Sequence, residues 1–79
     1  MDVYTVARIV DYGPALSRAE VDLDLRAKLQ QGVDYYREHG IDGGSSYRAA
    51  TIGRVRIADR PSHIEDCRAR RIEAEVTFL

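Results

Sequence analysis

Six arginines crowd into the last third of the chain, and their chemistry stands out in the sequence. They are Arg54, Arg56, Arg60, Arg68, Arg70 and Arg71. A guanidinium binds carboxylates and phosphates through paired hydrogen bonds. Within residues 54–71, six arginines stand against Asp59, Glu65 and Asp66, a net charge of +3, although the whole chain has a formal net charge of −1. This segment is therefore predicted to contact an acidic surface or the phosphates of a macromolecular partner.

The same arginines have a second interpretation, because they could pair with acidic residues inside a sheet. Arg48 and Arg56 come within reach of Glu73, Glu75 or Asp66 if the last two segments form a hairpin. Nucleic acid is the less favoured partner, because the tyrosines that would stack on bases fall on the inward parity of the strands. We therefore expect a protein partner or a second copy of the chain.

Three tyrosines near the middle of the chain could provide stacking surfaces. Tyr35 and Tyr36 are adjacent, and Tyr47 follows after a glycine-rich loop. Aromatic rings of this kind could stack on a flat ligand at a subunit interface. They could equally pack at the boundary of the core, and the sequence alone leaves both interpretations open.

The remaining polar residues do not form a catalytic or metal-binding set. Asp22 and Asp24 diverge by about 200° on a helix, so they cannot share one cation unaided. His63 and Cys67 could meet across a turn, but a lone cysteine on a strand is usually a small buried apolar residue. We therefore expect no enzymatic activity, no metal and no cofactor.

The cysteine content and the hydropathy pattern limit the cellular setting. Cys67 is the only cysteine, which excludes an internal disulfide and favours a reducing, cytoplasmic location. No apolar run approaches the roughly 20 residues that cross a bilayer, and the first ten residues lack a basic lead followed by an apolar stretch. We expect no membrane partner, and the 79 residues are predicted to form a single domain, 1–79.

One long helix is predicted over residues 18–39. Ser17 and Glu20 have the spacing of a capping box. Apolar residues then recur on one helical face, namely Val21, Leu25, Leu29, Val33 and Tyr36. Gly40 supplies the residue type that commonly ends a helix. Gly32 is unexpected inside a helix, and Leu23 lies off the apolar stripe, so either could face a partner.

Three strands complete the predicted fold. Residues 3–12 are apolar on both parities, which predicts a strand inside the sheet. From Tyr47 to Ile57 the apolar and small residues alternate with Arg48, Arg54 and Arg56, placing Thr51 and Gly53 on the inward side. Residues 67–79 return with Ile72, Ala74, Val76 and Phe78 inward. A bulge near Arg70 and Arg71 is expected to correct the phase of Cys67 and Ala69.

The element order is therefore β-α-β-β, an α+β fold with one long helix on a three-stranded, largely antiparallel sheet and a long C-terminal hairpin. A single helix covers only one face of such a sheet. The uncovered face predicts a homo-oligomer, formed by a stacked or an extended sheet. We predict a small non-enzymatic protein that binds a macromolecule or assembles with itself, such as an accessory subunit or a phage-type inhibitor of a larger complex, with the arginine-rich hairpin as contact surface.

The order and lengths of these elements resemble the dodecin architecture, in which such protomers assemble into a hollow oligomer that stores flavin. The resemblance covers most of the chain and concerns element order and lengths, not residue motifs. It implies an alternative function, an oligomeric protein that binds or stores a small molecule of the flavin type. The tryptophan that stacks on flavin in that family has no counterpart, because this chain contains no tryptophan.

Overall fold

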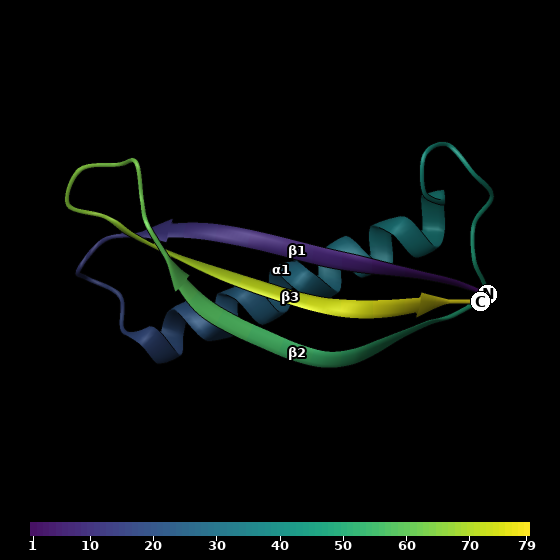
Figure 1. Ribbon diagram of the computed structural model, residues 1–79, viewed down its shortest axis with the longest axis horizontal. Helices are drawn as coiled ribbons and strands as arrows, with labels where there is room; N and C mark the ends of the chain where they lie inside the picture. The colour runs from purple at the N-terminus through teal and green to yellow at the C-terminus, as the bar shows by residue number, and fades with distance from the viewer.

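The computed structural model describes residues 1–79 and has the predicted α+β architecture (Figure 1). The elements follow the order β1 (Asp2–Tyr12), α1 (Arg18–His39), β2 (Ala50–Arg60) and β3 (Arg68–Phe78). The three strands form one antiparallel sheet in the order β1-β3-β2. The two chain ends lie side by side (Figure 1), because Asp2 of β1 pairs with Phe78 of β3.

The helix has the predicted boundaries, and its end signals act as expected. The Ser17 hydroxyl accepts a hydrogen bond from the Glu20 amide at 3.2 Å and donates to the Glu20 carboxylate at 3.1 Å, which completes the capping box. Gly40 ends the helix with a φ of 76°, and its amide donates to the Tyr36 carbonyl at 2.9 Å. The helix is not apolar enough to cross a membrane.

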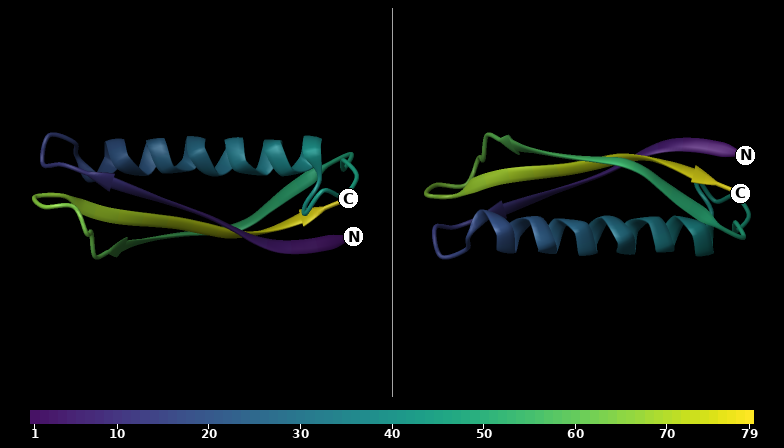
Figure 2. Two further views of the ribbon diagram at one scale, coloured as in Figure 1. Left: turned by 90° about the horizontal axis from the view of Figure 1, so that it is seen from above. Right: turned by 90° about the horizontal axis from the view of Figure 1, so that it is seen from below.

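The core lies between the helix and one face of the sheet (Figure 2). The predicted helical stripe of Val21, Leu25, Leu29 and Val33 is buried, with exposed fractions of 2% or less. It packs in one cluster with the inward residues of β3, which are Ile72, Ala74, Val76 and Phe78. Both inward sets were correctly identified from their periodicity.

The predicted position of the first strand is wrong, because β1 is an edge strand and β3 occupies the centre. The inward residues of β3 have no exposed surface, which suits the strand that has neighbours on both sides. The second apolar parity of β1 remains open to solvent, with Val3 and Ile9 exposed to 55% and 59%. Apolar residues on both faces therefore did not mean burial on both faces.

The predicted bulge near Arg70 and Arg71 is also wrong. β1 pairs with β3 in unbroken register along all of β3, whereas the register of β2 against β3 shifts between Ile52 and Val55. Gly53 lies in the shifted segment, where a Cβ would approach the Glu75 carbonyl oxygen to 3.0 Å.

The bulge in β2 changes which of its residues face the helix. Ala50 and Ile52, like Val55 and Ile57, are partly buried against the core. The expected inward placement of Thr51 and Gly53 is therefore incorrect, because both are exposed. A bulge inserts one extra residue into a strand. In β2 the even-numbered residues therefore face the helix before the bulge, and the odd-numbered residues face it afterwards.

Candidate binding surface on the open face of the sheet

Most of the face of the sheet opposite the helix is uncovered (Figure 2). At one end, Ser62 of the β2–β3 turn donates to Asp11 at 2.7 Å, and Ala69 is only 2% exposed. We call this surface the open face, and strand parity assigns three sets of side chains to it. From β1 it receives Val3, Thr5, Ala7, Ile9 and Asp11; from β3, Ala69, Arg71, Glu73, Glu75 and Thr77; from β2, Thr51, Arg56, Ala58 and Arg60. The β1 side is mostly apolar, the central strand is charged, and the β2 side is basic.

The six arginines of the hairpin lie in four different environments. Arg56 and Arg71 share one carboxylate on the open face, at 3.3 Å and 3.2 Å from the two oxygens of Glu73. The predicted pairing of Arg56 inside the sheet is therefore confirmed. The Arg56 side chain remains 65% exposed, so its ion pair adds little to stability and leaves the guanidinium within reach of a partner.

Arg54 and Arg60 form the second group. Both are exposed on β2, and neither takes part in a salt bridge. Arg54 lies at the bulge and lines a shallow hollow with Gly53, Arg56 and Glu75. The bulge thus adds a third basic group to the same edge of the sheet and leaves two guanidinium groups free to bind an anion.

Arg70 does not share this surface. It lies on the helix side of β3, where its side chain is only 11% exposed. Its guanidinium donates to Asp22 at 2.6 Å and 3.3 Å and to Asp59 at 2.8 Å. These bonds raise the pKa of Arg70 and hold the pKa of Asp22 below its ordinary value. Arg70 therefore links α1, β2 and β3 rather than offering a contact.

Asp22 and Asp59 are the residues that sequence reasoning missed. Asp22 was considered only as a cation ligand beside Asp24, but it is the main partner of Arg70. The missed signal was parity. Without a bulge in β3, Arg70 has the same parity as Ile72 and must turn toward the helix, where it needs an acidic partner.

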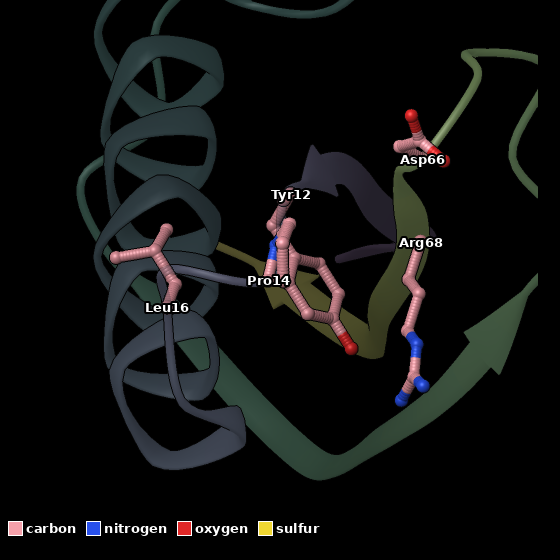
Figure 3. A pocket seen from close by; sticks show the side chains of 6 residues that line it. Tyr12, Pro14, Leu16, Asp66 and Arg68 are labelled. Atoms are coloured by element: carbon pink, nitrogen blue, oxygen red, sulfur yellow. The ribbon is translucent and has the colours of Figure 1, made fainter.

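Arg68 occupies a fourth environment, at the end of the sheet (Figure 3). It pairs directly with Tyr12 across β1 and β3. Both side chains line a hollow of about 220 Å³, together with Gly13, Pro14, Leu16 and Asp66. This volume falls below the roughly 300–1,000 Å³ of typical small-molecule pockets. The hollow therefore suits a single small group more than a whole flavin.

The three candidate stacking tyrosines do not form one platform. Tyr35 contacts Tyr36 edge-on at 5.9 Å between ring centres and lies 4.5 Å from the His39 ring. Tyr47 instead packs on Phe78 at 5.0 Å and donates a hydrogen bond to Asp2 at 2.7 Å. Tyr35 is the member whose ring is most available, at 59% exposed.

His63 and Cys67 lie in the turn between β2 and β3. His63 is exposed and Cys67 is half-buried. The Cys67 amide donates to the Ile64 carbonyl at 3.2 Å, which closes the turn. The expected absence of a catalytic pair at these two residues stays a prediction.

Comparisons of the chain with protein-family models, with curated proteins and with solved structures give no match. The flavin storage implied by the dodecin resemblance stays a prediction.

Proposed function

We propose that this protein is a non-enzymatic binding module that docks on an acidic protein surface through the open face of its sheet. The charged contacts are Arg54, Arg56 and Arg60 on β2. Arg68, Arg70 and Arg71 leave the predicted contact set. Arg68 and Arg70 lie on the helix side, and the Arg71 side chain is only 31% exposed, against 65% for Arg56 beside the same Glu73.

The observation that supports this proposal is the unequal pairing of charges across the sheet. The guanidinium groups of Arg54 and Arg60 form no salt bridge, and Arg56 shares one carboxylate with Arg71. Arginine is enriched at protein interfaces, where its planar group recognises carboxylates with defined geometry. Carboxylates of an acidic partner would form the ion pairs that Arg54 and Arg60 lack within the chain.

The experiment reverses only the two unpaired arginines, which preserves the Arg56–Glu73 ion pair. Arg54→Glu combined with Arg60→Glu should lose an acidic partner that the native chain captures from a lysate of its host. Arg8→Glu combined with Arg48→Glu is the matched control, because both arginines are exposed, neither forms a salt bridge, and the change in net charge is the same. The captured partner is then purified and its affinity measured against salt concentration.

Two outcomes would contradict the docking surface. In the first, the Arg54/Arg60 variant retains the partner at unchanged affinity. In the second, the control loses as much binding as the variant, which would indicate dependence on net charge only. Preferential binding of an oligonucleotide over poly-glutamate by the native chain would support nucleic acid as the partner instead.

The apolar side of the open face supports a second part of the proposal, self-association. Val3 and Ile9 are more than half exposed on β1, beside the small side chain of Ala7. We propose that a second copy covers this strip.

The native protein should sediment with a mass well above the 8.9 kDa of one chain, and Ile9→Lys should return it to that mass. Leu23→Lys is the control, since Leu23 is 70% exposed on the helix. A native chain that stays a single copy at high concentration refutes this part.

A further inference from the structure

The hollow at the end of the sheet contains a buried tyrosine whose hydroxyl has no protein partner. Tyr12 is only 8% exposed, yet its hydroxyl forms none of the side-chain hydrogen bonds of the protein. No fully buried side-chain nitrogen or oxygen lacks a partner. The Tyr12 hydroxyl must therefore reach solvent, and the residue lines the hollow (Figure 3).

A second hydrogen-bond donor lies beside this hydroxyl. Tyr12 and Arg68 are directly opposed in the antiparallel register, so their side chains project to the same face from neighbouring positions. In Figure 3 the Tyr12 hydroxyl and the Arg68 guanidinium extend in the same direction, and the Asp66 carboxylate points the opposite way. Arg68 takes part in none of the seven salt bridges. Two unused donors thus line one small hollow.

We propose that the Tyr12–Arg68 hollow binds a single carboxylate group. The guanidinium offers a planar fork of N–H donors, and the phenol offers one O–H donor, which together match the two oxygens of a carboxylate. Pro14 and Leu16 provide an apolar wall for the carbon atoms that bear the group. The volume of about 220 Å³ admits one side-chain-sized acid.

The number of donors in the lining favours a carboxylate over a phosphate. The Arg68 guanidinium and the Tyr12 hydroxyl can satisfy the two oxygens of a carboxylate. A phosphate dianion has three charged oxygens to satisfy, and the lining brings only one positive charge, beside the negative charge of Asp66. The carboxylate can belong to a small free acid or to an acidic side chain of a polypeptide, and the experiment separates these sources.

The test is a titration of the full-length, ¹⁵N-labelled chain followed by two-dimensional NMR at constant ionic strength. The probes are acetate, a glutamate residue blocked at both ends, and inorganic phosphate at a pH where it is mainly dianionic. Acetate should shift the amide signals of Tyr12, Gly13 and Arg68 along a saturable curve. Shifts with both carboxylates assign the site to the group itself, and shifts with blocked glutamate alone assign it to acidic side chains.

Three variants make the assignment specific. Tyr12→Phe keeps the buried ring and should weaken carboxylate binding about tenfold, the effect of losing one hydrogen bond to a charged group. Arg68→Gln should abolish binding, and this exposed position keeps the fold intact. Arg60→Gln, at the end of the neighbouring strand, should leave binding unchanged.

The proposal is overturned if the shifts persist in both Tyr12→Phe and Arg68→Gln, if neither carboxylate shifts these amides, or if phosphate binds more tightly than acetate. The site stands apart from the docking surface, because Arg68 lies on the helix side of the sheet. The Arg54/Arg60 variant should therefore still bind the carboxylate, so failure of one proposal leaves the other intact.

Discussion

The guanidinium of Arg70 binds the carboxylate of Asp22 through two hydrogen bonds, at 2.6 Å and 3.3 Å. This contact joins the N-terminal part of α1 to the start of the central strand, and Asp59 of β2 adds a third bond at 2.8 Å. An arginine that is 11% exposed would be costly to bury without such partners. The three groups therefore fix the helix over this end of the sheet.

Replacing Arg70 with lysine should destabilise the fold while preserving the charge. An ammonium cannot form the planar, multiply bonded contact that the guanidinium forms with two carboxylates. We expect the free energy of unfolding to fall by about 1–3 kcal/mol, measured by urea denaturation. Arg68→Lys, two residues earlier on the same strand and exposed, should change it by no more than about 0.5 kcal/mol. Equal effects at the two positions would contradict the structural role of Arg70.

The same contact predicts a loss of stability in acid. Hydrogen bonding to Arg70 lowers the pKa of Asp22 below its usual value of 3.8. A carboxyl whose pKa is lower in the folded state stabilises the fold above the unfolded-state pKa, and this contribution is lost as the pH falls through the folded-state pKa. The urea concentration at the midpoint of unfolding should therefore decrease once the pH falls below about 4. The midpoint of the Asp22→Asn variant should change less with acid than that of Asp24→Asn. Asp24 is the control, because its exposed carboxylate pairs only with Lys28.

Alkaline titration should reveal the bond between Tyr47 and Asp2. The Asp2 carboxylate accepts a hydrogen bond from the Tyr47 hydroxyl, which raises the pKa of Tyr47 to about 12. The stabilising effect is complete below the unfolded-state value of 10.0 and is lost as the pH rises through the folded-state value. The ultraviolet absorbance of tyrosinate should show one late transition, which Asp2→Asn moves to lower pH. Asp42→Asn should leave it in place, and a late transition that survives Asp2→Asn would exclude this bond as its cause.

Local signals in the sequence were sufficient for the helix and for most of the core. The Ser17–Glu20 capping box, the apolar stripe and Gly40 define α1 through contacts between near neighbours. The alternation of β3 from Ile72 to Phe78 likewise gives its inward face directly. Strand order depends on contacts between distant segments, which explains why β1 was placed inside the sheet and is found at its edge.

The candidate binding surface was harder to predict because one bulge determines the parity of a whole strand. Gly53 was the local sign of the bulge, since glycine within a strand often marks a close backbone approach. The bulge was instead predicted at Arg70 and Arg71. Arg70 was therefore expected on the contact surface, and its bonds to Asp22 and Asp59 were not predicted. The basic edge of β2 was nevertheless identified correctly, because Arg54 and Arg56 both remain exposed.

The two glycines of the helix region should respond oppositely to substitution by alanine. A Cβ at Gly32 would meet only the guanidinium of Arg8, with the nearest nitrogen at 2.9 Å. That group is the far end of an exposed, flexible side chain and can move aside. Alanine has a higher helix propensity than glycine by about 1 kcal/mol, so Gly32→Ala should raise the free energy of unfolding by up to that amount.

Gly40→Ala should lower the free energy of unfolding by more than about 1 kcal/mol. Its φ of 76° lies in the left-handed region, and a Cβ would collide with the backbone of Gly44 and Ser45, which cannot move independently of the loop. Urea denaturation of both variants beside the native chain tests the pair. If Gly32→Ala destabilised the fold as strongly as Gly40→Ala, Arg8 would have to be rigidly held over the helix, and Gly32 would then be required by packing against β1.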